Sequence, residues 1–278
     1  MIIHLVDGTY ELFRHFYGIR RFKKTDPPLG AVSGVLSTVV QLLEDGATPV
    51  GVATDHIIES FRNNLWAGYK TGAGIERALR AQFEPLEESL AAMGVTVWAM
   101  VELEADDALA SAAYLANQVE RVEKVCIWTP DKDLAQCVVD ERVVQVDRRG
   151  GVIRGAAEVK AKFGVAPEFI PDYLALVGDS ADGYPGISGC GAKTAARLIN
   201  RYGPLEKFPP DALNDENRVL ALLFKDLATL RTDAPLFKDV DELCWRGATK
   251  AFAAVAEKVE SARLLARVKK LEKRLINT

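Results

Sequence analysis

Short apolar runs alternate with segments of helical periodicity through the first half of the chain. The strongest runs are rich in β-branched residues and do not alternate with polar ones: Ile2–Val6, Val50–Thr54 and Val125–Thr129. Such runs are typical of strands buried on both faces of a parallel sheet. Clear helical spacings lie between them at Ala31–Leu43, Phe83–Met93 and Asp106–Asn117, and weaker strand patterns lie at Thr96–Trp98 and, after the last run, at Arg142–Val146. This order predicts a three-layer α/β domain with right-handed crossovers.

Strand patterns end near residue 156, and the rest of the chain is expected to be helical. The predicted helices are Ala156–Phe163, Pro167–Val177, Ala192–Arg201 and most of Asn214–Arg231, followed by one long helix, charged on one face, at Ala251–Leu275. We therefore expect an α/β domain over residues 1–155 and a helical region over residues 156–278.

Each strong apolar run leads directly into acidic residues. Asp7 follows the first run, Asp55 the second, and Asp131 and Asp133 the third, while Glu102–Asp107 adds four acids where the Thr96–Trp98 strand turns into a helix. In open parallel sheets, sites form beyond the carboxyl ends of the strands, so these acids should converge. One aspartate could be a helix N-cap, but four such junctions are more than capping explains. Like charges this close need cations, so the pattern predicts a polynuclear divalent-metal site.

The ligand types narrow the metal and the chemistry. Oxygen ligands without histidine or cysteine favour Mg²⁺ or Mn²⁺ over Zn²⁺. The four cysteines show no paired spacing, which argues against structural zinc and a disulfide framework. Several carboxylates around two or more Mg²⁺ ions suit phosphoryl transfer. No GxxxxGK[ST] sequence is present, which argues against a nucleoside triphosphatase.

Net charge and hydropathy add two limits. The formal charge of −4 is unfavourable for nucleic-acid binding, but without the nine carboxylates assigned below to the metal site the remainder carries +5. No apolar run approaches eighteen residues, and no basic region precedes an apolar segment at the start. We therefore expect a cytoplasmic protein without a membrane partner.

A second motif lies at Gly178–Thr194. Asp179 and Asp182 are three residues apart, which in a helical turn would place both carboxylates on one face. Gly189-Cys190-Gly191 then opens a predicted helix, where glycines and the helix N-terminus favour a phosphate. A plain Gly/Pro turn between two helices is the alternative.

Five sequence blocks together resemble the bacterial 5′-nuclease family (flap endonucleases and 5′→3′ exonucleases), which includes the N-terminal nuclease domain of DNA polymerase I. The blocks are Leu5–Gly8, Ser60–Arg62 with Gly68–Lys70, Glu104–Asp107, Thr129–Leu134 and Gly178–Thr194. The similarity runs from Ile3 to about Pro235, and because no polymerase follows, a stand-alone nuclease is expected. It implies a PIN-like α/β fold whose helical region contains a helix-hairpin-helix variant, the helix-three-turn-helix, at about residues 167–205.

The resemblance assigns the acids to two metal clusters. The first cluster would be Asp7, Asp55, Glu104 and Asp106, and the second Asp107, Asp131, Asp133, Asp179 and Asp182. Catalysis would depend on Lys70, at the base of an arch and in contact with the scissile phosphate, and on Asp7, Asp106, Asp131 and Asp133.

The resemblance also implies contacts with DNA and with K⁺. Residues expected to bind DNA are Arg14, Arg62, Lys70, Arg77, Gly189, Gly191, Lys193 and Thr194. The arch is expected at about residues 68–84, chiefly Thr71–Gln82. The family's arginine three residues after the lysine is absent here, since Ala73 stands there, and Arg77 or Arg80 is expected to replace it. Main-chain carbonyls expected to bind K⁺ are those of Leu176, Val177, Asp179, Pro185 and Ile187.

The sequence as a whole predicts a structure-specific 5′ nuclease. Its expected substrates are branched or 5′-ended duplex DNA, with RNA–DNA primer junctions as further candidates, and its implied setting is replication and repair. We expect a monomer. Two alternatives remain open: a PIN-type ribonuclease, and a catalytically inactive binder of DNA structures, which would be expected to lack some of the nine acids.

Overall fold

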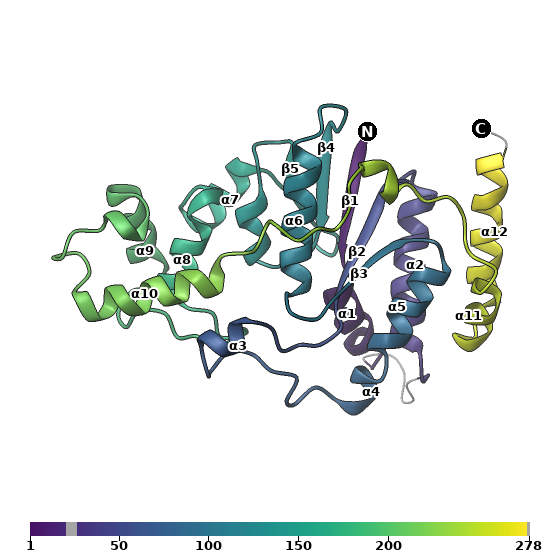
Figure 1. The fold of residues 1–278 in the computed structure, drawn as a ribbon, viewed down its shortest axis with the longest axis horizontal. Coiled ribbons are helices and arrows are strands. Elements are labelled where there is room, and N and C mark those ends of the chain that lie inside the picture. Colours follow the sequence, from purple (N-terminus) through teal and green to yellow (C-terminus); the bar gives the residue numbers. More distant parts are fainter. Residues whose placement is uncertain (21–26, 277–278) are drawn as a thin grey trace.

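The computed structural model describes residues 1–20 and 27–276, and within them one mostly parallel sheet forms the centre of the molecule (Figure 1). Its strands are β1 (Ile2–Asp7), β2 (Val50–Asp55), β3 (Thr96–Met100), β4 (Lys124–Trp128), β5 (Val143–Asp147) and β6 (Val152–Arg154). They run in the order β3-β2-β1-β4-β5-β6, and all neighbours are parallel except the β5–β6 pair. The predicted α/β class is confirmed; β6 was not predicted, because three mostly exposed residues carry no apolar pattern.

Helices cover both faces of this sheet. One face packs against α1 (Gly8–Arg20), α2 (Gly30–Glu44) and α5 (Phe83–Ala92), through a core that includes Val6 and Val52. The other face packs against α6 (Ala105–Asn117), whose alanine-rich side lies on Ile3 and Leu5. Two short helices, α3 (Arg62–Leu65) and α4 (Arg77–Arg80), lie in the segment between β2 and α5.

β1 is the point at which the strand order reverses. It pairs with β2 on one side, with Asp7 opposite Ala53, and with β4 on the other, with Val6 opposite Trp128. The connections after β1 therefore diverge to opposite sides and leave a crevice at the carboxyl ends of the strands. This crevice receives the acidic residues that follow β1, β2 and β4.

A smaller helical region with its own core adjoins the β5–β6 edge of the sheet (Figure 1). Its helices are α7 (Ala156–Phe163), α8 (Ile170–Val177), α9 (Ala192–Tyr202) and α10 (Asp215–Ala228). Single 3₁₀ turns are η1 (Asp133–Cys137) and, within this region, η2 (Pro167–Phe169) and η3 (Leu205–Lys207). Tyr173, Leu174, Tyr184 and Phe224 are among the residues of this second core.

The C-terminal part differs from the prediction in two ways. After a 3₁₀ turn, η4 (Val240–Leu243), the expected single helix is two, α11 (Phe252–Lys258) and α12 (Ala262–Ile276). The chain turns between them at Glu260, whose φ of 52° is left-handed and therefore not helical.

Both C-terminal helices belong in space to the α/β domain. Phe252, Leu264 and Val268 enter the core of α2 and α5, and Arg267 pairs with Glu44 of α2. Figure 1 places α12 beside α2, at the opposite end of the molecule from α9 and α10. Residues 156–278 are therefore not one packing unit, because the chain recrosses the sheet after α10. The apolar pattern could not show this, since an amphipathic helix does not specify the surface it covers.

Among the described residues, we find no helix with the length and apolar character needed to cross a membrane.

Candidate metal centre

Acidic residues at the ends of the strands line one cleft of about 380 Å³. Asp7 and Asp55 are the last residues of β1 and β2, Asp106 lies in the first turn of α6, and Asp131 follows β4. All four line the cleft, together with Asp182, Lys70, Tyr10 and Phe13. The convergence expected from the strand order is therefore present.

Local hydrogen bonds orient the two strand-end carboxylates. Asp7 accepts from the Tyr10 backbone N–H at 2.8 Å and from the Thr129 hydroxyl at 2.9 Å. Asp55 accepts from the Ala105 N–H at 2.8 Å, and its own N–H donates to the Thr9 hydroxyl. The threonines were not predicted, because their role depends on which loops meet at the ends of the strands.

A second group of acids is formed by Asp133, Asp179 and Asp182, hereafter the second acid group. Each offers a carboxylate oxygen within 4.8 Å of the others. Asp133 begins η1, whereas the other two lie in the turn after α8, so the group joins the sheet to the helical region. The Ala181 N–H donates to Asp179 at 2.9 Å, and the Lys132 ammonium lies 2.7 Å from the other Asp179 oxygen.

Burial and the charges of neighbouring acids raise the pKa values of several of these carboxyl groups. Burial, with the charges of Asp55 and Asp131, raises the pKa of Asp7 to about 7. Burial and the Asp131 and Asp7 charges raise the pKa of Asp106 well above its usual value. Burial and the charges of Asp131, Asp182 and Asp179 do the same to the pKa of Asp133. So many acids at one point are stable in the ionised form only with cations among them.

The residues present fit hard divalent cations. The donors are carboxylate oxygens, and neither histidine nor cysteine lines the cleft or belongs to the second acid group. One oxygen of Asp133, Oδ1, is buried without a hydrogen-bond partner in the part of the chain described, as expected of an atom whose partner is an ion or its water. Mg²⁺ and Mn²⁺ prefer such oxygen ligands.

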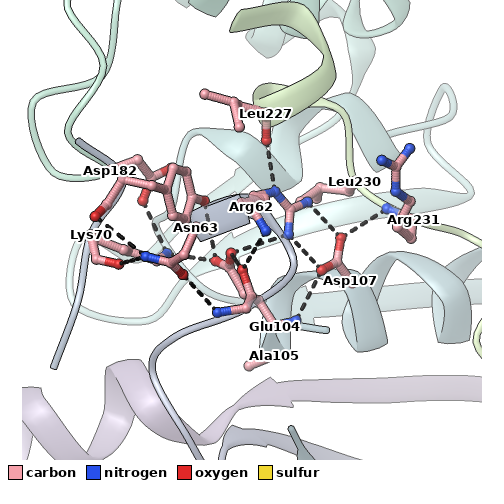
Figure 2. A network of polar contacts seen from close by, with 12 residues as sticks. Arg62, Asn63, Lys70, Glu104, Ala105, Asp107, Asp182, Leu227, Leu230 and Arg231 are labelled. Carbon is pink, nitrogen blue, oxygen red and sulfur yellow. Dashed lines mark hydrogen bonds and ion pairs between the residues drawn. The ribbon is translucent and has the colours of Figure 1, made fainter. Parts of the chain in front are cut away.

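Lys70 lies inside the acidic site. Its ammonium is 2.7 Å from Glu104 and 3.0 Å from Asp182, and its backbone N–H donates to the Asp182 carbonyl at 2.9 Å (Figure 2). Burial would lower the pKa of Lys70, but the charges of Glu104 and Asp182 outweigh burial and raise it. Lys70 therefore carries a permanent positive charge between an acid of the α/β domain and one of the helical region.

Arg62 and Asp107 form a buried pair behind the cleft, contrary to the roles expected for both (Figure 2). Arg62 is 1% exposed and Asp107 0%. The two guanidinium amino groups donate to the two Asp107 oxygens at 2.7 Å each. Asp107 also accepts from the backbone N–H groups of Glu104, at 2.9 Å, and Arg231, at 2.8 Å. The carboxylate is fully hydrogen-bonded, which leaves it no role as a metal ligand, and the guanidinium cannot reach DNA.

The same arginine links Glu104 to the end of α10. Arg62 donates to Glu104 at 3.1 Å and, through Nε, to the Leu227 carbonyl at 2.8 Å. Glu104 accepts further from the Ser60 hydroxyl at 2.6 Å. Glu104 is thus oriented by the Arg62 guanidinium rather than left free in the cleft. Sequence spacing could not indicate this, because the side-chain partners of Arg62 lie 42 to 167 residues away.

The segment expected to form the arch borders the cleft through Thr71 and Ile75. Its far end is anchored, because Leu79 is fully buried and the Gln82 side chain accepts from the N–H groups at the start of α2. Arg77 and Arg80 both lie on α4 and are exposed. Neither lines the cleft, and which of them replaces the family arginine stays a prediction.

The remaining expected DNA contacts lie outside the acidic cleft. Arg14 pairs with Glu11 on α1, beside the cleft residue Tyr10. Gly189, Gly191 and Lys193 are exposed around the start of α9, and Thr194 is half-buried. Of the carbonyls expected to bind K⁺, that of Leu176 accepts from Ile187, and that of Asp179 accepts from both Gly183 and Tyr184. The Asp179 carbonyl therefore already accepts two hydrogen bonds, and the K⁺ site stays a prediction.

Gln145 was missed by sequence reasoning. It is fully buried on β5, and its side-chain amide donates to the Asp131 carbonyl. A polar residue within an apolar run was the available signal, since a buried amide needs a nearby partner.

Two family models together match nearly the whole chain. The "5′-3′ exonuclease, N-terminal resolvase-like domain" covers residues 2–164, and the "5′-3′ exonuclease, C-terminal SAM fold" covers residues 165–251. A DNA polymerase I from Pseudomonas aeruginosa is 36% identical over 86% of this chain, and the chain spans 28% of that relative's length. A 5′-3′ exonuclease from Aquifex aeolicus is 31% identical, with 87% of this chain and 86% of the relative covered.

Solved structures show the same fold at low identity. A T5 5′-exonuclease with bound divalent metal ions has a TM-score of 0.63 and 18% identity, covering 100% of this chain and 99% of the neighbour. The catalytic core of Rad2 in complex with DNA substrate has a TM-score of 0.61 and 13% identity, covering 98% and 92%.

Removing the Asp107 charge should destabilise the metal-free protein, whereas removing the charge of an acid in the cleft should not. Asp107→Asn should lower the metal-free free energy of unfolding by roughly 3 kcal/mol, because it removes the bidentate partner of the buried Arg62 guanidinium and leaves Glu104 as its only carboxylate. Asp106→Asn should be neutral or stabilising, because it relieves repulsion. Urea unfolding in chelator measures both. A stabilising Asp107→Asn would return Asp107 to the ligand set.

The raised pKa of Asp7 makes the stability of the metal-free protein depend on pH. The folded-state pKa of about 7 exceeds the unfolded value of 3.8, so the folded state alone holds this proton in between. Stability from this group is therefore present at low pH and lost as pH rises through 7. Between about pH 5.5 and 8 the loss should be roughly 2 kcal/mol. Urea unfolding of wild type minus Asp7→Asn isolates it, and parallel pH profiles would contradict it.

Proposed function

Because the chain belongs to the 5′-3′ exonuclease family, we propose that it is a divalent-metal-dependent nuclease that hydrolyses phosphodiesters in 5′-flap, nicked or 5′-ended duplex DNA. The observation that carries this proposal is the convergence of acids at the carboxyl ends of β1, β2 and β4. The proposal covers flap endonuclease and 5′→3′ exonuclease activity, with RNA–DNA primer junctions as further substrates and replication and repair as the setting.

Two or more Mg²⁺ or Mn²⁺ ions are the proposed cofactors. They would be held by the cleft acids Asp7, Asp55, Asp106 and Asp131, with Glu104, and by the second acid group. When bound, such ions activate water and stabilise the leaving oxygen of a phosphodiester. Asp7 and Asp55, held by backbone N–H groups, keep their carboxylates aimed into the cleft.

Lys70 is proposed to act on the substrate phosphate. Its ammonium has a strongly raised pKa and stays protonated in the working pH range. Charge that develops on the phosphate is stabilised by a fixed positive group in a partly dehydrated site. Because Lys70 now pairs with Glu104 and Asp182, bound cations and a phosphate would compete for all three groups.

The start of α9 is proposed to hold duplex DNA away from the cleft, as part of a helix-hairpin-helix. The exposed basic residues Lys193, Arg197 and Arg201 follow the turn that carries Gly189 and Gly191. Basic groups and N–H groups at a helix N-terminus suit phosphate contacts that set the position of a duplex. Carbonyls of Leu176, Val177, Asp179, Pro185 and Ile187 are the proposed K⁺ ligands in this turn, and the protein is proposed to act as a monomer.

The substrate class is tested with end-labelled 5′-flap, nicked, blunt and RNA-primed duplexes of one sequence, with and without Mg²⁺. The proposal expects Mg²⁺-dependent cleavage near the junction or at the 5′ end. Equal rates on single-stranded RNA and on flap DNA would instead favour a ribonuclease. Binding of flap DNA without cleavage would favour an inactive DNA-structure binder.

Replacing both Asp131 and Asp133 by Asn should abolish cleavage while flap DNA still binds. Asp131 is one of the cleft acids and Asp133 belongs to the second acid group, whereas the proposed duplex contacts lie on α9. Single-turnover cleavage should fall by at least about 10³-fold, as when electrostatic stabilisation is lost from an active site. Fluorescence anisotropy with labelled flap DNA measures binding in parallel. Undiminished cleavage by this variant would refute the assignment of the site.

Lys193→Ala should weaken binding of duplex DNA and reduce its salt dependence. Loss of one phosphate contact lowers the slope of log K against log salt by about 1 for duplex DNA. The matched control is Lys258→Ala, an exposed lysine on α11 at the other end of the molecule. If both variants kept the wild-type slope, α9 would not be the duplex contact.

A further inference from the structure

Tyr184 lies behind the second acid group with an unsatisfied hydroxyl. The residue is 1% exposed, and its ring packs against Phe224 of α10 at 5.4 Å between centroids. Its hydroxyl has no hydrogen-bond partner within the described chain. A buried hydroxyl without a partner is costly, and a phenylalanine would fill the same space without that cost. We therefore expect the hydroxyl to have a hydrogen-bond partner when the site holds its ligand.

The backbone directs this side chain toward the acids. Tyr184 and Asp179 exchange two backbone hydrogen bonds, of 2.8 and 3.0 Å, as an isolated antiparallel bridge. Directly opposite residues of such a pair project their side chains to the same side. Tyr184 and Asp179 also line one pocket, together with Lys132.

One acid of the same group has a matching unsatisfied atom. Asp133 Oδ1 is buried without a partner within the described chain, and Asp133 is grouped with Asp179, the residue paired with Tyr184. The nearby lysines are engaged elsewhere, Lys132 with Asp179 and Lys70 with Asp182 and Glu104. One residue paired with the second acid group and one member of it thus carry a buried donor and a buried acceptor that are both unsatisfied. A cation with its water satisfies both, whereas a protein side chain supplied by this chain does not.

We propose that Tyr184 is a positioning residue of the cation site formed by Asp133, Asp179 and Asp182. Its hydroxyl donates a hydrogen bond to water in the hydration shell of the bound ion, beside Asp133 Oδ1. Mg²⁺ and Mn²⁺ keep several waters when bound by few carboxylates, and groups that hold such waters contribute to metal affinity. The inference rests on the proposed function only in requiring a divalent cation at these acids.

A structural role and this role differ in what Tyr184→Phe changes. If the hydroxyl serves the ion, the variant binds Mn²⁺ at this site roughly 3- to 10-fold more weakly, the effect of one hydrogen bond. Its metal-free stability stays equal or rises, because an unsatisfied hydroxyl is removed. Consequently the rise of the unfolding temperature on adding Mn²⁺ is smaller than in the wild type. If the hydroxyl has only a structural role, Tyr184→Phe lowers metal-free stability and leaves the Mn²⁺ affinity unchanged.

The experiment is a Mn²⁺ titration of the full chain, followed by calorimetry and by the EPR signal of free Mn²⁺, with urea unfolding in chelator alongside. The binding event lost in Asp133→Asn identifies the site. Tyr202→Phe, whose ring packs on Phe208 in the same helical region, is the matched control and should keep wild-type affinity. In the Asp133→Asn background, Tyr184→Phe should have no further effect on Mn²⁺ binding.

Two results would overturn the proposal: equal Mn²⁺ affinities of Tyr184→Phe and wild type, or an equal loss in Tyr202→Phe. Cleavage of flap DNA by the wild type is measured separately. If wild type binds Mn²⁺ but does not cut DNA, the proposed function fails while the role of Tyr184 stands. If wild type cuts DNA and Tyr184→Phe binds Mn²⁺ normally, only this inference fails.

Discussion

Repulsion among carboxylates is the constraint on which the arrangement of this protein depends. The fold brings acids from three strand ends, one helix start and the turn after α8 to one crevice, where burial and mutual charge raise their pKa values. Such a site is stable only with cations. The protein supplies two of its own, Lys70 and Lys132, and leaves room for divalent ions. Metal affinity and the cost of folding without metal thus have the same physical origin.

A second buried charge pair holds this site together. Arg62 and Asp107 satisfy each other with two 2.7 Å hydrogen bonds, and from that position Arg62 reaches Glu104 in the site and Leu227 at the end of α10. The pair is therefore a joint between the α/β domain and the helical region. Lys70 and the second acid group form another joint on the cleft side. The position of the helical region, and of any DNA it holds, is tied to the metal site through both.

These joints explain why sequence neighbours in the Glu104–Asp107 block have different roles. Asp106 faces the cleft, whereas Asp107, one residue on, is enclosed by Arg62 and Arg231. A helix turns by about 100° per residue, so two adjacent side chains leave it in different directions. Lys132, the residue before η1, contacts Asp179, whereas Asp131 lines the cleft and Asp133 belongs to the second acid group.

The sequence by itself determined the mostly parallel sheet, most of its helices and the presence of an acidic oxygen-ligand site, because strand periodicity and acids at strand ends are local patterns. Contacts between distant segments decided the rest. The pairing of Arg62 with Asp107, the unsatisfied hydroxyl of Tyr184 and the return of α11 and α12 to the first core depend on which surfaces meet after folding. A residue's chemistry is written in the sequence, but its partner is set by packing, and the partner decides whether an acid binds metal or neutralises an arginine.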